Sequence, residues 1–164
     1  MTAPDLPLAW NDSLLLGFPA MDEEHRDFVA CLLALQSADP GDTAEVAARL
    51  DDFAAHARRH FAAEDAWMNE TAFPPRQCHI DEHAAVLKSV DEVRALVAQG
   101  RTEHVPSLAA ALADWFPRHA HHLDSALATW MCKQRFGARP LVLRRGVASA
   151  QPSISPPHSH FHDT

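Results

Sequence analysis

Residues 79–97 read HIDEHAAVLKSVDEVRALV, and their apolar positions follow the period of an α-helix. The positions that would face a core recur every three or four residues, and they are His79, His83, Val86, Val90, Val93 and Val97. This spacing predicts an amphipathic helix with one buried face. The first two turns of that face carry imidazole where aliphatic side chains would be expected. The segment therefore predicts a packed helix with a polar centre beside its first turns.

Three other stretches show the same periodicity, and segments rich in Pro, Gly and Asp separate them. The breaks fall at residues 38–42, at Phe73-Pro74-Pro75 and at Gly100, and Asp42 or Thr43 is a suitable N-cap residue for the second helix. The expected helices span about residues 20–37, 43–70, 76–99 and 106–135. Four helices joined by short connections predict an all-α fold, an up-down four-helix bundle.

Both ends of the chain differ from the helical part. Residues 1–19 combine prolines and a glycine with Trp10 and Phe18, which suits an ordered N-terminal arm laid over the bundle. Residues 136–164 are rich in Pro and Gly and carry a net charge of +2, against −10 for residues 1–135. We therefore expect a bundle domain over residues 1–135, which includes the arm, and a mostly disordered tail over residues 136–164.

Composition excludes several classes of partner. The net charge of −8 would repel nucleic acid and anionic membranes. No run without a polar side chain exceeds eight residues, the length of Leu14–Met21, and this is far short of the roughly 20 residues that cross a bilayer. We also expect no secretion signal. Three cysteines cannot all pair and form no CxxC motif, which favours free thiols in a reducing cytoplasm.

Histidine is the unusual residue of this chain, with 12 in 164 positions. On the predicted helices, five histidines fall at core-facing positions, and two carboxylates lie within reach of them. These seven residues are His25, His60, Glu64, His79, His83, His119 and Asp124. A single buried histidine is usually explained by a hydrogen bond to a carbonyl group. Five on four facing helices favour one shared polar centre, since unpaired burial would cost several kcal/mol.

The donor set indicates which metals such a centre would hold. Five imidazoles and two carboxylates are too many ligands for one tetrahedral zinc ion, but they suit two metals bridged by the carboxylates. A nitrogen-rich and oxygen-bridged site favours iron. One spacing is awkward, because His119 and Asp124 are five residues apart and about 140° apart on an ideal helix. We therefore expect a local widening or kink near Pro117.

These motifs resemble the hemerythrin-like proteins, and among them the bacteriohemerythrins, over residues 10–133. The resemblance lies in Trp10 with Leu16-Gly17, in Met21-Asp22-Glu23-Glu24-His25, and in His60-Phe61-Ala62-Ala63-Glu64 followed by Met68. It continues in His79 with His83 and in Trp115, His119 and Asp124. The five-residue spacing of the last two is that of the family. The chain departs from the family pattern at Glu24, Asp65 and Pro117, none of which is a ligand position.

The resemblance implies two iron ions bridged by oxo or hydroxo and by Glu64 and Asp124. One iron would be held by His79, His83 and His119, and the other by His25 and His60, with a position open to dioxygen or another small diatomic ligand. A dry apolar pocket would be needed around that position. The aromatic candidates for the pocket are Trp67, Trp115 and Phe116.

Three functions stay open at this point. The first is a non-enzymatic dioxygen-binding protein for sensing, storage or delivery, whose partner in sensing would be another chain that the tail contacts. The second is a di-iron enzyme acting on peroxide or nitric oxide, with extra histidines as proton donors. The third is a helical module stabilised by metal. His122 lies on the predicted inner face, which would favour the enzyme. His121 and His104 are expected in solvent. For His56, a place beside the site and a place in solvent or at the edge of the core both stay open.

Overall fold

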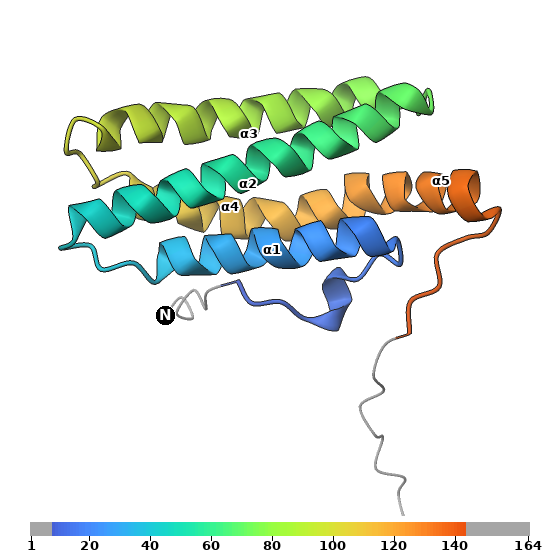
Figure 1. The fold of residues 1–164 in the computed structure, drawn as a ribbon, viewed down its shortest axis with the longest axis horizontal. Coiled ribbons are helices and arrows are strands. Elements are labelled where there is room, and N and C mark those ends of the chain that lie inside the picture. Colours follow the sequence, from blue (N-terminus) through green and yellow to red (C-terminus); the bar gives the residue numbers. More distant parts are fainter. Residues whose placement is uncertain (1–7, 144–164) are drawn as a thin grey trace, which may run out of the picture.

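The computed structural model describes residues 8–143, and every regular element within that range is a helix (Figure 1). Four α-helices precede a π-helical turn and a last α-helix, after a single 3₁₀ turn in the arm. Their bounds are η1 Asp12–Leu14, α1 Pro19–Gln36, α2 Thr43–Glu70, α3 Arg76–Val97, α4 Val105–His119, η2 Ala120–Asp124 and α5 Ser125–Phe136. The all-α prediction is confirmed for the described residues.

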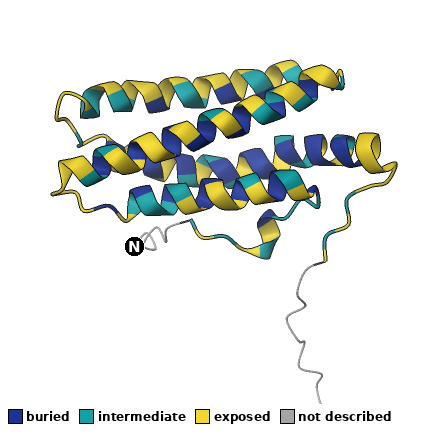
Figure 2. Cartoon of the chain, viewed as in Figure 1, coloured by how far each residue is buried: buried dark blue, intermediate teal, exposed yellow. Residues whose placement is uncertain are grey.

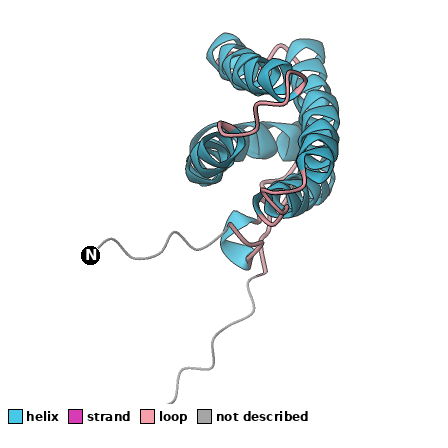
Figure 3. Cartoon of the chain, turned by 90° about the vertical axis from the view of Figure 1, so that its left-hand side faces the viewer, coloured by secondary structure: helices cyan, strands magenta, loops and turns pink. Residues whose placement is uncertain are grey.

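The helices form a four-membered bundle in which α4, η2 and α5 together make one rod. Helix α1 packs on α2 and α4, and α3 packs on the same two helices, so each member has two neighbours (Figure 3). Short connections make successive helices antiparallel. The predicted up-down bundle is therefore confirmed.

The helix ends follow the signals read from the sequence. Asp42 is the N-cap of α2, and its carboxylate accepts hydrogen bonds from the backbone N–H groups of Ala44 and Glu45. Pro19 stands at the first position of α1, where its missing N–H is not needed. Helix α3 ends two residues earlier than expected, and a turn continues from it to Gly100.

Buried residues, dark blue in Figure 2, occur on all the helices. Their apolar side chains form two clusters. The larger core includes Phe28, Leu32, Leu50, Phe53, Phe61, Leu112 and Phe116. The smaller core comprises Phe18, Met21, Met68, Phe73, Leu127, Ala128, Met131 and Cys132. On each of α1, α2 and the α4–α5 rod, the predicted polar residues lie between members of the two cores. The polar centre is therefore enclosed by apolar packing on both sides.

The described part of the arm is tied to the start of α1. The buried carboxylate of Asp22 accepts hydrogen bonds from the backbone N–H groups of Leu16 (2.7 Å) and Gly17 (3.0 Å). The indole of Trp10 lies under the guanidinium of Arg26, 4.9 Å from its ring centre. The predicted arm over the bundle is confirmed for residues 8–18, and residues 1–7 lie outside the described range.

The start of the predicted tail is described and lies against the arm. Phe136 ends α5, and Gly137 closes the helix in the left-handed conformation. Pro140 and Val142 then pass close to Gly17. Residues 144–164, with His158, His160 and His162, lie outside the described residues.

Gly17 provides a test of this contact. Its φ is +82°, and a Cβ atom there would lie 2.8 Å from Cβ of Pro140, so Gly17→Ala should lower the free energy of unfolding by about 1–3 kcal/mol. Gly100→Ala is the matched control, because Gly100 has a φ of +78° but no atom of the described residues lies within 4 Å of the added Cβ. Urea denaturation should show a larger loss for Gly17→Ala. Equal losses would mean that the contact with Pro140 contributes nothing.

Within residues 8–143, no helix combines the length and the apolar character needed to span a bilayer.

Candidate metal centre

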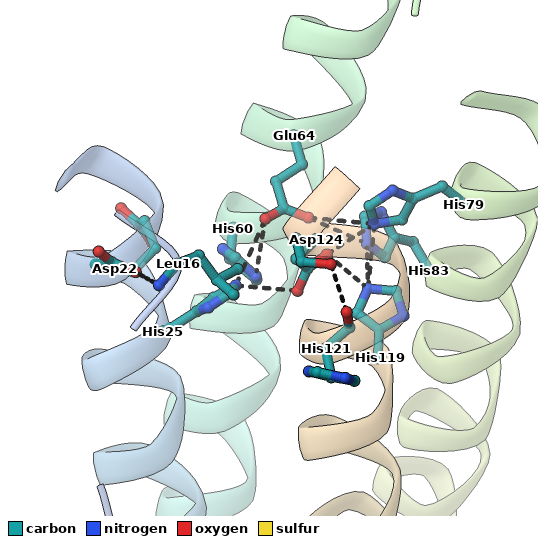
Figure 4. A network of polar contacts seen from close by, with 12 residues as sticks. Leu16, Asp22, His25, His60, Glu64, His79, His83, His119, His121 and Asp124 are labelled. Carbon is teal, nitrogen blue, oxygen red and sulfur yellow. Dashed lines mark hydrogen bonds and ion pairs between the residues drawn. The ribbon is translucent and has the colours of Figure 1, made fainter. Parts of the chain in front are cut away.

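Seven polar side chains from all four members of the bundle converge between the two cores (Figure 4). None of them is more than 3% exposed. They are His25 from α1, His60 and Glu64 from α2, His79 and His83 from α3, His119 from α4 and Asp124 from η2. The structure thus brings together every residue that the sequence placed in the polar centre.

Three imidazoles meet on one side of this cluster, and we call His79, His83 and His119 the three-histidine half. The Nε2 atom of His119 lies 3.1 Å from Nε2 of His79 and 3.2 Å from Nε2 of His83. Ligand atoms at right angles around an ion with bonds of roughly 2.1 Å are about 3 Å apart. The separations in the three-histidine half therefore suit neighbouring ligands of one metal ion.

Two imidazoles lie on the other side, and we call His25 and His60 the two-histidine half. Their rings meet edge to face with centroids 5.2 Å apart. The Nε2 atoms of both histidines lie 3.6 Å from Oε1 of Glu64. This half has one imidazole fewer than its counterpart.

The two buried carboxylates stand between the halves, and each directs one oxygen to each side. For Glu64, Oε1 faces the two-histidine half, whereas Oε2 lies 3.3 Å from Nε2 of His83. For Asp124, Oδ2 lies 3.1 Å from Nε2 of His25, and Oδ1 lies 2.9 Å from Nε2 of His79. This is the arrangement by which two carboxylates can bridge two cations.

Asp124 reaches the centre because the helix widens just before it. Residues Ala120–Asp124 form a π-helical turn, in which the N–H of Ser125 donates to the carbonyl of Ala120 five residues earlier. One extra residue is thereby taken up in the turn. The widening expected near Pro117 is confirmed, and it begins three residues after that proline.

The fit of a cation to this centre can be judged from the polar atoms that have no other partner. Within residues 8–143, both carboxylate oxygens of Glu64 and Asp124 and both ring nitrogens of His25 and His60 make no hydrogen bond of normal geometry. Burying polar atoms without hydrogen-bond partners costs free energy of folding. The Nε2 atoms of His25 and His60 nevertheless lie 3.1–3.6 Å from carboxylate oxygens of Glu64 or Asp124, because these atoms point toward shared positions. The residues therefore fit metal ions placed among them.

In the metal-free protein, burial and the two buried carboxylates have opposite effects on the pKa values of the imidazoles in the cluster. Burial by itself lowers the pKa of His25, but the contacts with Asp124 and Glu64 outweigh it and raise the pKa to about 10. The same balance raises the pKa of His79 to about 9. Burial dominates at His60 and lowers its pKa to about 4. Burial would raise the pKa values of Glu64 and Asp124, yet the surrounding imidazoles hold both well below their usual range.

Metal binding should consequently release protons. At pH 8, His25 and His79 carry protons in the metal-free protein, and a metal needs their lone pairs, so loading the centre should release about two protons. Metal affinity should rise with pH up to about 10, and most steeply below about 9, where both imidazoles are still protonated. Calorimetric titration with Co²⁺ in buffers of different ionisation enthalpy measures the number of protons released. A heat that is independent of the buffer would show that the two imidazoles are neutral before binding.

Aromatic rings cover the cluster on the side of the larger core. Phe116 packs edge-on against His25, with centroids 5.1 Å apart, and stacks on Phe28 at 4.5 Å. Trp115 lies 4.3 Å from the ring of His119, and Phe61 stacks on His83 at 4.1 Å. Trp115 and Phe116 therefore contact the centre as predicted, and Phe28 and Phe61 were missed because their positions are equally those of ordinary core residues.

Trp67 was wrongly included among the pocket candidates. It packs edge-on against Phe18 in the smaller core, at 5.4 Å between ring centres, and its ring lies beside the guanidinium of Arg135. Its half-buried position follows from the turn of α2 beyond Glu64, which directs position 68 inward and leaves position 67 at the edge.

The other histidines within residues 8–143 lie outside the seven-residue cluster. His122 is exposed, so its predicted inward position is wrong. The widened turn shifts the register, so Ala126 and Trp130, four and eight residues after His122, are exposed and half-buried. The buried positions of α5 are Leu127, Ala128, Met131 and Cys132. His121 and His104 are exposed as expected.

His56 is buried, and its ring contacts the backbone of another helix. Its Nε2 atom lies 3.1 Å from the carbonyl oxygen of Glu24 on α1. Its ring is nearly parallel to that of His60, with centroids 6.0 Å apart. Burial lowers the pKa of His56 despite the nearby charge of Glu24. His56 therefore joins α2 to α1 one turn away from the cluster.

Two carboxylates outside the cluster hydrogen-bond to its imidazoles. The Nδ1 atom of His83 lies 2.8 Å from Oδ1 of Asp65, and Nδ1 of His119 lies 2.9 Å from Oε2 of Glu82. From the sequence, Asp65 stood out only as a departure from the family pattern, and Glu82 was not predicted to contact the centre. Asp65 directly follows Glu64, and Glu82 directly precedes His83. These positions next to predicted ligands were the signal from which the two carboxylates could have been found.

The fold and the cluster together define a helical-bundle protein with a candidate metal centre in its core. The sequence model of the hemerythrin HHE cation binding domain matches residues 16–131. The chain therefore belongs to the hemerythrin family.

Comparison with individual proteins supports the same family. A bacteriohemerythrin of Ralstonia nicotianae is 36% identical over 132 residues, which cover 80% of this chain and 94% of that protein. A bacteriohemerythrin of Stenotrophomonas maltophilia is 30% identical over 122 residues, which cover 74% and 79% of the two chains. The crystal structure of a hemerythrin point mutant superposes with a TM-score of 0.68 at 19% identity and covers 73% of this chain and 94% of the other. That last likeness concerns the fold alone.

Proposed function

We propose that this protein binds dioxygen reversibly at two iron ions, without catalysing a reaction of it. The seven clustered residues would be the ligands, with Glu64 and Asp124 as bridges. The observation that carries the proposal is the division of each carboxylate, which directs one oxygen to each half of the centre. A site for one ion would not need two carboxylates placed in this way.

The unequal halves support the binding of a small ligand. The three-histidine half supplies three nitrogens besides the bridging oxygens, whereas the two-histidine half supplies two. With an oxo or hydroxo bridge, the second ion would have one coordination position fewer filled by the protein. Iron at this centre would supply the redox chemistry of dioxygen binding.

The apolar surroundings support binding over turnover. Phe116 and Phe28 are fully buried beside the two-histidine half, so they exclude water from it. His122, one of the histidines that motivated an enzyme acting on peroxide or nitric oxide, is exposed and so is not placed as a proton donor inside the centre. Apolar surroundings that exclude water allow a ligand to be held without being protonated.

The comparisons and the cysteines support the remaining parts of the proposal. Relatives called bacteriohemerythrin cover most of their own length in the match. The free thiols of Cys31, Cys78 and Cys132 support a cytoplasmic location, where thiols stay reduced. A partner chain that binds the tail is proposed only for the sensing role, and residues 144–164 lie outside the described range.

The test is an absorption spectrum of the reduced, iron-loaded protein before and after exposure to air. We expect a new visible band on oxygenation that disappears when oxygen is removed and returns over repeated cycles. Direct conversion to the ferric spectrum without a reversible stage would contradict oxygen binding. Steady consumption of peroxide or nitric oxide above the rate of free iron would instead favour the enzyme.

A further inference from the structure

Hydrogen bonding outside the cluster is unequal between its two halves. In the three-histidine half, two of three imidazoles have a carboxylate on Nδ1, Asp65 for His83 and Glu82 for His119. Within the described residues, Nδ1 of His25, His60 and His79 has no hydrogen-bond partner. The two-histidine half therefore has no such support on either of its rings.

Each of these carboxylates also joins two helices. Asp65 on α2 accepts from His83 on α3, and Glu82 on α3 accepts from His119 on α4. The Asp65 side chain is 31% exposed and that of Glu82 is 50% exposed, so water competes with both bonds. Their contribution to folding is accordingly small. Their effect on ring orientation does not depend on burial, because it comes from the direction of the bond.

A carboxylate on Nδ1 has two effects on an imidazole. It fixes the tautomer that carries the proton on Nδ1, which leaves the Nε2 lone pair directed at the centre. It also increases the basicity of the ring and holds its plane. In the described part of the chain, His83 and His119 are the only imidazoles of the cluster that receive this support, and both belong to the same half. The two added negative charges likewise lie on that side of the cluster.

We infer that the centre loads its metals in order, with the three-histidine half filled first, and that Asp65 and Glu82 are the positioning residues that set this order. The inference rests on the proposed metal-binding function and concerns how the site is assembled. It predicts two classes of affinity in one cluster. It also predicts that a chain with one metal holds that ion between α2, α3 and α4.

The test is titration of the metal-free full-length protein with Co²⁺, followed by calorimetry and by the visible spectrum of the bound ion. The wild-type protein should bind two ions in two resolved steps. Asp65→Asn and Glu82→Gln should each weaken the first step by about 10-fold and leave the second unchanged. The double variant should weaken the first step by about 100-fold, so that the two steps merge. Asp81→Asn is the matched control, because Asp81 is exposed on α3 and, among residues 8–143, its carboxylate accepts a hydrogen bond from Gln77 and none from an imidazole.

A second measurement separates positioning from a general change of charge. In the protein with one Co²⁺ ion, the hyperfine-shifted N–H protons of His83 and His119 should exchange with solvent slowly, and each should exchange faster in the variant that removes its carboxylate. Asp81→Asn should not change either rate.

The outcomes distinguish this inference from the function on which it rests. Wild-type binding of two Co²⁺ ions in one step, or unchanged first-step affinity in Asp65→Asn and Glu82→Gln, would overturn the loading order and leave the metal centre intact. Weakening of the second step alone would also overturn it. A wild-type protein that binds no Co²⁺ would remove the proposed centre and this inference together.

Discussion

Replacing Glu64 with glutamine should reduce the metal content of the purified protein from two ions to one and abolish the reversible oxygen band. The amide keeps the size of the side chain but removes a charge that both halves share. Breaking a buried charge network costs about 3–5 kcal/mol, which corresponds to a loss of at least about 100-fold in affinity for the second ion. Metal analysis after dialysis and the spectrum in air measure both effects.

The control for this variant is Glu70→Gln, which removes the same charge from an exposed position near the end of α2. It should retain two ions and the wild-type spectrum. If Glu64→Gln also retained both ions with unchanged affinity, Glu64 would not be a bridge, and the proposal would lose the observation that carries it.

Replacing Phe116 with alanine should lower the free energy of unfolding by about 3–5 kcal/mol and shorten the life of the oxygenated protein. Phe116 is fully buried and packs against both Phe28 and His25. Its removal leaves a cavity beside the two-histidine half that water can enter. Denaturant titration measures the first effect, and the decay of the oxygen band in air measures the second.

Phe136→Ala is the control, because that ring is 64% exposed at the end of α5. It should lower stability by well under about 1 kcal/mol and leave the decay rate unchanged. If Phe116→Ala lost stability but its oxygenated form decayed at the wild-type rate, the ring would serve packing alone and not the exclusion of water.

Periodicity placed the histidines of the polar centre correctly on the regular helices, although Val86, Val93 and Val97 of the predicted α3 face are only half-buried. On α1, His25 is buried as predicted. On α3, His79 and His83 are buried for the same reason. A helix repeats its faces in a fixed way, so spacing along the chain is sufficient to place these side chains.

The same rule failed where the helix is not regular or where a contact depends on a neighbouring helix. The position of His122 was wrong because η2 takes up an extra residue, which spacing alone cannot locate. The hydrogen bond of Glu82 to His119 connects two helices, and it depends on how they pack. Assigning the seven residues to two irons rested on the family resemblance, and it stays a prediction that metal analysis would test.

The widened turn η2 also changes how related centres should be sought in other sequences. His60 and Glu64 are four residues apart, whereas His119 and Asp124 are five apart, yet both pairs direct their polar atoms to the same cluster. The fifth residue behaves as a local insertion, after which the rod continues on the same face with Leu127. A search that accepts only pairs with regular helical spacing would reject this chain. A search that permits one inserted position in the last helix would find it.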